Sequence, residues 1–184
     1  MEPRETKQQW RRDVAILKKK YSQETFGRLS AEIQYRVEQL PLFRQARRIA
    51  FYHALPDEVQ TADFIEKWRR DKQILLPVVN GDTLSLQPYA GKDALEKGAF
   101  DIMEPASLQK DADNEADVII APGIAFDRQL NRLGRGKGYY DRLLSVHPAP
   151  AIGICFQFQL FDRVPADDHD RKMTLVVTEE EIVG

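Results

Sequence analysis

The sequence predicts a single α/β domain with a mixed, mostly parallel sheet, helices on both faces of that sheet, and further helices at the N-terminus. Short apolar runs recur from residue 48 onwards, and segments with helical spacing separate several of them. Strands of a parallel sheet read as such nearly continuous runs, because helices bury both of their faces. The 184 residues suffice for one domain with a substantial core, so we expect residues 1–184 to form a single domain.

Two helices are expected in the first forty residues. The first carries an apolar stripe at Trp10, Val14, Leu17 and Tyr21. The second carries one at Phe26, Leu29, Ile33 and Val37. These spacings are helical, and the second helix should begin near Ser22 and end before Pro41, since a proline disfavours helix in the residue that precedes it.

Six strands are expected after these helices. They are the apolar runs at residues 48–53, 74–79, 84–89, 117–123, 151–156 and 174–179. Asn-Gly-Asp at residues 80–82 is typical of a tight hairpin turn, so the second and third strands should pair antiparallel. Thr61 is the candidate N-cap of one further helix, and residues 138–145 begin another.

Composition excludes several classes of protein. The chain has 27 basic and 29 acidic residues, so no overall positive field draws it to nucleic acid and any anion site must be local. No run approaches the roughly 18 apolar residues of a membrane span, and the N-terminus lacks the apolar core of a secretory signal. Cys155 is the only cysteine, which indicates a buried thiol. We therefore expect a cytoplasmic monomer with no membrane or nucleic-acid partner.

A basic, glycine-rich loop, RLGRGKGYYDR at residues 132–142, follows the strand expected at 117–123. Its glycines let backbone N–H groups approach a ligand, and its arginines and lysine add positive charge. Ligands of open α/β sheets bind beyond the carboxyl ends of the strands, where this loop emerges. Spacing and charge favour a phosphate site, with Asp141 within reach of a phosphate-bound magnesium ion. A basic turn without a ligand is the alternative, because the pattern is neither a Walker loop nor a dinucleotide fingerprint.

The longer stretch APGIAFDRQLNRLGRGKGYYDRLL, residues 121–144, closely resembles the signature of the 5-formyltetrahydrofolate cyclo-ligase family. Further matches follow the family's order at KQQWR (7–11), YHALPDEVQT (52–61), GAFDIMEP (98–105), FQFQ (156–159) and DDHDRKMTLVVTEEE (167–181). The resemblance implies ATP- and Mg²⁺-dependent closure of the small-molecule substrate 5-formyltetrahydrofolate to 5,10-methenyltetrahydrofolate, with release of ADP and phosphate. A nucleotide-binding relative of the same fold without this turnover is the alternative.

The reaction that the resemblance implies requires the protein to position the two substrates and to neutralise the charge of the phosphates. A formamide carbonyl is a weak electrophile and its oxygen leaves poorly, and transfer of the γ-phosphoryl group to that oxygen solves both problems. The folate N10 then attacks the carbon while phosphate departs. Because little covalent work falls to the protein, a cationic glycine loop suits this reaction without a Ser–His or Cys–His pair.

The resemblance also assigns roles to individual residues. ATP would be bound by Lys7, Arg11, Arg132, Leu133, Gly134, Arg135, Gly136, Lys137, Gly138, Tyr139 and Tyr140. The candidate catalytic residues among them are Arg135, Lys137 and Tyr140. The folate would contact His53, Glu58 and Tyr139, and the metal would be held by Asp141. From the residues alone, Lys7 and Arg11 also read as a solvated helix face and Glu58 as an exposed loop acid.

Two positions depart from the family's pattern. Leu130 stands where the family usually has glycine, and since leucine does not freely adopt positive φ, the turn before the loop is expected to differ. Thr174 stands where the family has an aspartate that can bind magnesium. Asp141 is therefore expected to bind the metal, with Asp170 as a second candidate ligand.

Two other classes of protein compete with the cyclo-ligase. A sugar-phosphate isomerase or CoA-transferase relative would need a general base in the crevice, and the sequence offers no clear motif for one. A nucleic-acid-binding module could use the basic loop and stack bases on its tyrosines, but a chain with a net charge of −2 is poorly suited to it.

Overall fold

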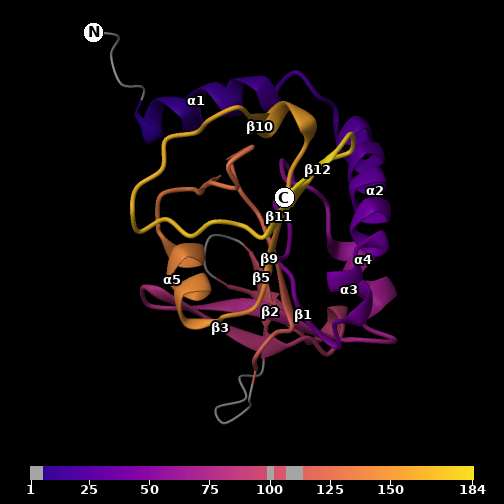
Figure 1. Cartoon of the computed structure of the whole chain (residues 1–184). Helices are drawn as coiled ribbons and strands as arrows, with labels where there is room; N and C mark the ends of the chain where they lie inside the picture. Colours follow the sequence, from indigo (N-terminus) through magenta and orange to yellow (C-terminus); the bar gives the residue numbers. More distant parts are fainter. Residues whose placement is uncertain (1–5, 99–101, 107–113) are drawn as a thin grey trace, which may run out of the picture.

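The computed structural model describes residues 6–98, 102–106 and 114–184, which form one mixed α/β domain (Figure 1). The main sheet has the strand order β12-β11-β9-β6-β1-β2-β3. Its strands are β1 (Arg48–Ala50), β2 (Gln73–Asn80), β3 (Thr83–Pro88), β6 (Val118–Ala121), β9 (Ala151–Ile154), β11 (Leu175–Val177) and β12 (Ile182–Val183). The strands from β11 to β2 run parallel, and an antiparallel strand closes each edge. The predicted fold class is confirmed.

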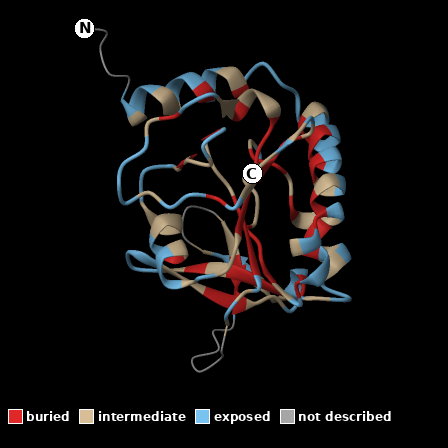
Figure 2. Cartoon of the chain, in the orientation of Figure 1, coloured by how far each residue is buried: buried red, intermediate tan, exposed pale blue. Residues whose placement is uncertain are grey.

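Helices cover both faces of this sheet. They are α2 (Gln23–Gln39), α3 (Pro41–Gln45) and α4 (Ala62–Trp68) on one face and α5 (Tyr139–Val146) on the other, whereas α1 (Lys7–Lys18) packs through Val14 on Ala125 and Leu133 outside this sheet. Successive residues of a strand point to opposite faces. Accordingly, Ile49 packs in one cluster with side chains of α2, α3 and α4, while the next residue, Ala50, packs with Leu143 of α5. Figure 2 shows α2 buried along its inner side and exposed along its outer side, as the apolar stripe predicts.

Short strands that the sequence does not predict complete the fold. A second sheet, in the order β10-β7-β8, consists of β7 (Ala125–Asp127), β8 (Arg132–Leu133) and β10 (Leu160–Phe161). A third pairs β4 (Leu95–Lys97) with β5 (Met103–Pro105). Strands this short carry too few residues for a recognisable alternation. β7 and β8 matter for the site because they form the stem of the glycine loop. Phe100, in the matched stretch 98–105, lies outside the described residues.

The turn between β7 and β8 corrects one prediction. Leu130 adopts a φ of 68°, so the expectation that leucine would avoid the left-handed region here is wrong. That conformation costs a non-glycine residue about 1–2 kcal/mol. Hydrogen bonds offset the cost, because Asp127 Oδ1 accepts from the backbone N–H groups of Gln129 and Asn131, both at 2.9 Å. The Leu130 side chain also packs against a buried cluster that includes Phe126.

Two smaller predictions need correction as well. α1 ends at Lys18, so Tyr21 lies beyond the helix, where its ring stacks on Phe158 with centroids 4.4 Å apart. Thr61 precedes α4, but its hydroxyl donates to the Tyr52 carbonyl at 2.6 Å instead of capping the helix. Within the described ranges, none of the helices has the length and apolar character needed to cross a bilayer.

An ion pair ties the C-terminal hairpin to the β7–β8 turn. Arg128 donates to both carboxylate oxygens of Glu181, at 2.9 and 2.8 Å, and Gln157 donates to one of them at 2.8 Å. These hydrogen bonds lower the pKa of Glu181 to about 2 from an ordinary value of 4.5. Because the folded-state pKa is depressed, the stabilisation is complete above pH 4.5 and is lost as the pH falls through about 2.

We expect Glu181→Gln to melt at a lower temperature than the intact chain near neutral pH, with a difference that shrinks between pH 4.5 and about 2. Thermal melts over this pH range measure the difference. Glu180→Gln is the matched control, because Glu180 is the exposed neighbour and forms no ion pair with the described residues. A melting difference that stays constant down to pH 2 would contradict the prediction.

Candidate functional site

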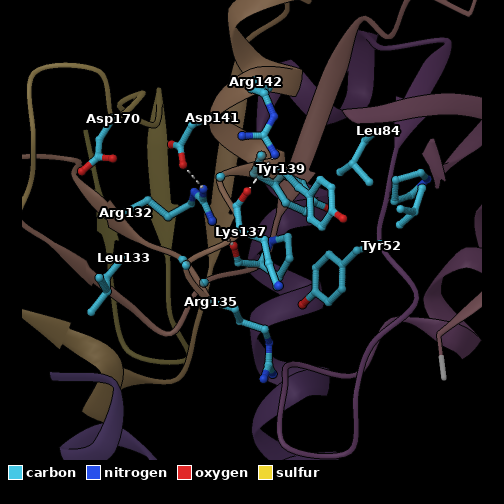
Figure 3. Close-up of a pocket in the computed structure, with 18 of the residues that line it drawn as sticks. Tyr52, Leu84, Arg132, Leu133, Arg135, Lys137, Tyr139, Asp141, Arg142 and Asp170 are labelled. Carbon is cyan, nitrogen blue, oxygen red and sulfur yellow. Dashed lines mark hydrogen bonds and ion pairs between the residues drawn. The ribbon is translucent and has the colours of Figure 1, made fainter. Parts of the chain in front are cut away.

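A cavity of about 900 Å³ lies beyond the carboxyl ends of the parallel strands β1, β2 and β6, where the glycine loop emerges. It is lined by every site residue that the sequence predicts, including both residues of α1 and the carboxylate of the loop after β1. Figure 3 shows Arg132, Asp141 and Asp170 on one side of the cavity, Tyr52 and Leu84 on the other, and Lys137 between them. The cavity thus combines a charged side with an apolar, aromatic one.

α1 brings Lys7 and Arg11 to the charged side. They are four residues apart and share one face of the helix. Arg11 Nε donates to the Gly134 carbonyl at 2.8 Å, which fixes the helix to the glycine loop. Lys7 Nζ lies 2.7 Å from Asp167 and contacts Asp170; although burial opposes its charge, these contacts raise the pKa of Lys7. The reading of both residues as a solvated basic face is therefore wrong.

The glycine loop needs Gly136 and Gly138 for their backbone conformation, and arginine side chains lie close to both. Gly136 and Gly138 have φ values of 100° and 69°, which favour glycine. A Cβ at Gly136 would lie 3.3 Å from the Arg11 guanidinium carbon, and one at Gly138 would lie 2.8 Å from Arg142. Gly138 is also the residue before α5, so the first turn of that helix adds N–H groups beside the cavity.

Arg132 is a buried cation that lines the charged side of the cavity. Its side chain is 4% exposed, lies over the Tyr140 ring at 5.4 Å, and donates to Asp141 Oδ2 at 3.2 Å. Its Nε is buried and finds no hydrogen-bond partner in the described part of the chain. Burial and the charge of Glu58 raise the pKa of Tyr140, so this phenol stays protonated at neutral pH. The protonated Tyr140 hydroxyl can donate a hydrogen bond, and its ring packs against Arg132.

Glu58 is nearly buried, with a relative exposure of 9%. One of its oxygens accepts from Leu55 N at 3.0 Å, and the other accepts from Arg135 at 2.9 Å. The alternative of an exposed loop acid is therefore wrong. His53 lines the same cavity and is half-buried, and burial lowers the pKa of His53, so its imidazole is neutral at neutral pH.

Carboxylates gather at the rim of the charged side. Asp141 accepts from Arg132 and from Arg171 N, the latter at 3.3 Å, and Asp170 also lines the cavity. Thr174 does not line it: its hydroxyl accepts from Ala151 N at 3.1 Å at the start of β9. The position aligned with Thr174 therefore offers no ligand to the cavity, whereas Asp170 does.

A model of the 5-formyltetrahydrofolate cyclo-ligase family matches residues 3–179. The chain belongs to this family. A probable 5-formyltetrahydrofolate cyclo-ligase of Schizosaccharomyces pombe is 30% identical over 174 residues, covering 84% of this chain and 85% of that protein. The NMR structure of Aquifex aeolicus 5,10-methenyltetrahydrofolate synthetase is similar over 96% of this chain and 91% of that one, with a TM-score of 0.87 and 34% identity. The sequence-based assignment of family and enzyme class is confirmed.

A Mycoplasma pneumoniae 5,10-methenyltetrahydrofolate synthetase shares the fold, with a TM-score of 0.73 at 24% identity over 94% of this chain and 98% of that one. Cys155 is buried in this cyclo-ligase, which confirms the predicted buried thiol, and burial raises the pKa of that thiol well above the usual value.

Sequence reasoning missed the apolar wall of the cyclo-ligase cavity. That wall includes Pro77, Val79, Leu84 and Ile102. In the sequence Pro77, Val79 and Leu84 read as ordinary strand positions and Ile102 carried no predicted role, and only the fold places them beside the glycine loop. Arg142 was missed too: it donates to the carbonyls of Asp82 and Lys137 at 2.6 and 2.7 Å and so fastens the β2–β3 hairpin to the loop.

Proposed function

We propose that this cyclo-ligase binds the phosphates of ATP on the charged side of the cavity and the pterin of 5-formyltetrahydrofolate on the aromatic side. It then closes the folate to 5,10-methenyltetrahydrofolate and releases ADP and phosphate. The observation that carries the proposal is that a cationic glycine loop and a nearly buried carboxylate, Glu58, meet in one cavity. We further propose that the enzyme acts as a monomer in the cytoplasm.

The charged side supplies the neutralisation that phosphoryl transfer needs. Lys7, Arg11 and Arg135 line it from α1 and the glycine loop. Lys137 lies in the same loop, is exposed, and pairs with no carboxylate in the described ranges. We assign Lys137 to the transferred γ-phosphate, because its ammonium reaches this group without first giving up an ion pair.

The aromatic side supplies recognition of the folate. A carboxylate accepts paired N–H donors from an aminopyrimidine edge, and we assign this role to Glu58, which lines the cavity. Tyr139 and Tyr52 provide flat apolar surface for the ring system. The neutral imidazole of His53 adds a polar contact that carries no charge into the folate side.

The covalent steps take place on the two substrates. The formyl oxygen attacks the γ-phosphorus, and the bond between that phosphorus and the ADP oxygen breaks. N10 then attacks the formyl carbon, its proton leaves, and the carbon–oxygen bond breaks with release of phosphate. The protein holds the reactants in line and screens the developing negative charge.

The rim carboxylates fit magnesium, which prefers oxygen ligands and binds through one or two carboxylates together with phosphate oxygens. We assign Asp141 and Asp170 to this role, because both line the cavity on its charged side. Bound there, the ion would withdraw charge from the phosphate oxygens. In the structure each carboxylate is paired with a cation of the site, Arg132 or Lys7.

A spectroscopic assay tests the function. We expect the absorbance of 5,10-methenyltetrahydrofolate to grow when the protein is mixed with 5-formyltetrahydrofolate, ATP and Mg²⁺, and to stop growing when EDTA is added. Omission of ATP is the second control. Binding of ATP without formation of the product would favour a nucleotide-binding relative of the same fold, and growth of the signal without ATP would contradict the proposed reaction.

A further inference from the structure

Two neighbouring carboxylates hold Arg135. Its guanidinium donates to Glu58 at 2.9 Å and to Asp57 at 3.3 Å, and both acids belong to the acidic loop, residues 55–60. Glu58 lines the cavity, whereas Asp57 does not and instead contacts Lys18 of α1. The four side chains form a row of alternating charge that runs from α1 into the cavity.

The acidic loop is firmly held. Glu58 N donates to the Leu55 carbonyl at 3.1 Å, and Leu55 N returns a hydrogen bond to the Glu58 carboxylate at 3.0 Å. The Gln60 amide donates to the carbonyls of both residues, at 3.0 and 2.8 Å. Lys18, whose side chain is 5% exposed, donates to Asp57 Oδ2 at 3.0 Å. Both carboxylates therefore have positions fixed by the surrounding chain.

Arg135 is the member of the row that can move. It lies between Gly134 and Gly136, its side chain is 48% exposed, and Gly136 has a φ of 100°. Glycines on both sides let the backbone turn at low steric cost. A change in the partner of Arg135 would therefore be taken up by the glycine loop and not by the acidic loop.

Each substrate of the proposed function, on which this inference rests, needs one member of the Arg135–Glu58 pair. A nucleotide phosphate competes with Glu58 for the guanidinium. The pterin donors compete with Arg135 for the carboxylate, whose two oxygens already accept from Arg135 and from Leu55. The first ligand to bind must separate the pair, and the second finds it separated.

We propose that Asp57, anchored by Lys18, is a positioning residue that keeps Arg135 on Glu58 until a ligand separates them, so that nucleotide and folate bind with positive coupling. Because linkage is reciprocal, each ligand raises the affinity for the other by the same factor. When both ligands bind, the Arg135–Glu58 pair is broken once and not separately for each ligand. We expect this to raise the affinity for each ligand about tenfold when the other is bound, which is within the usual range of such couplings.

Calorimetric titration with β,γ-imido-ATP and Mg²⁺, without and with saturating 5-formyltetrahydrofolate, measures the coupling, since this analogue does not transfer its γ-phosphoryl group. In the intact protein we expect the folate to tighten nucleotide binding about tenfold. Asp57→Asn keeps an acceptor for Lys18 but weakens the hold on Arg135. We expect it to tighten nucleotide binding about two- to fivefold without folate and to leave it unchanged with folate bound.

Lys18→Met should act in the opposite direction. Among the residues that the structure describes, it leaves Arg135 as the one cation paired with Asp57, so nucleotide binding without folate should weaken about two- to fivefold. Asp162→Asn is the matched control, because it removes an exposed carboxylate beside Arg128, away from the cavity, and should keep the full coupling. Opposite shifts in two variants that melt like the intact protein are not expected from a general loss of structure.

Two results would overturn the inference. One is equal nucleotide affinity with and without folate in the intact protein. The other is equal tightening by Asp57→Asn in both states, which would mean that Asp57 acts through its field alone. If the intact protein forms 5,10-methenyltetrahydrofolate but shows either result, only this inference fails. If it binds neither ligand and forms no product, the proposed function fails.

Discussion

Lys137→Met is expected to lower kcat/KM for 5-formyltetrahydrofolate by about 10²–10³, the usual cost of removing one preorganised group that stabilises transition-state charge. Lys137 lies in the cavity, between two glycines with positive φ, and pairs with no carboxylate of the described chain. Its ammonium is therefore free to follow the charge that develops on the transferred phosphoryl group. Because that charge is greatest in the transition state, the loss should fall mainly on kcat.

Steady-state kinetics with both substrates measures this effect. Lys20→Met is the matched control, since it removes an exposed lysine beyond the end of α1 and should leave kcat unchanged. Lys137→Arg should retain more activity than Lys137→Met because it keeps the charge. A rise in the KM for ATP at unchanged kcat would show that Lys137 serves only to bind the nucleotide, contrary to the assigned role.

Local sequence pattern was sufficient to predict most of the main sheet and of its helices, although it missed the edge strand β12 and the short helix α3. The apolar runs around Ile49, Ile74 and Ile119 are β-branched and nearly continuous, and they became the parallel strands β1, β2 and β6. The stripe that includes Ile33 became the buried side of α2. These elements form where side chains are buried, and buried positions can be recognised in the sequence by the spacing of apolar residues.

The site could be predicted as a set of residues, but its internal contacts could not. Lys7 and Asp170 are 163 positions apart, and Arg135 and Glu58 are 77 apart. Such pairs depend on strand order, which no local pattern contains. Leu130 shows the same limit, since the hydrogen bonds to Asp127 override the conformational preference of leucine. Local preference fails where tertiary contacts decide the backbone.

Asp127 is the buried group on which the stem of the glycine loop depends most. It is fully buried, and its Oδ1 accepts from the N–H groups of Gln129 and Asn131 at 2.9 Å. Its Oδ2 accepts from the Asn131 amide at 2.9 Å and from Val164 N at 3.0 Å. One carboxylate thus holds both the Leu130 turn and the segment that follows β10.

We expect Asp127→Ala to lower the free energy of unfolding by about 3–5 kcal/mol, because it leaves the buried Val164 N–H and three part-buried N–H donors without an acceptor, and each buried donor left unpaired costs about 1–3 kcal/mol. Asp127→Asn keeps the shape and one acceptor oxygen, so about half of that loss is expected. Urea unfolding measures both values, with Asp162→Ala as a control at an exposed carboxylate. A loss below about 1 kcal/mol for Asp127→Ala would mean that water replaces the carboxylate and that the turn is held by Leu130 packing instead.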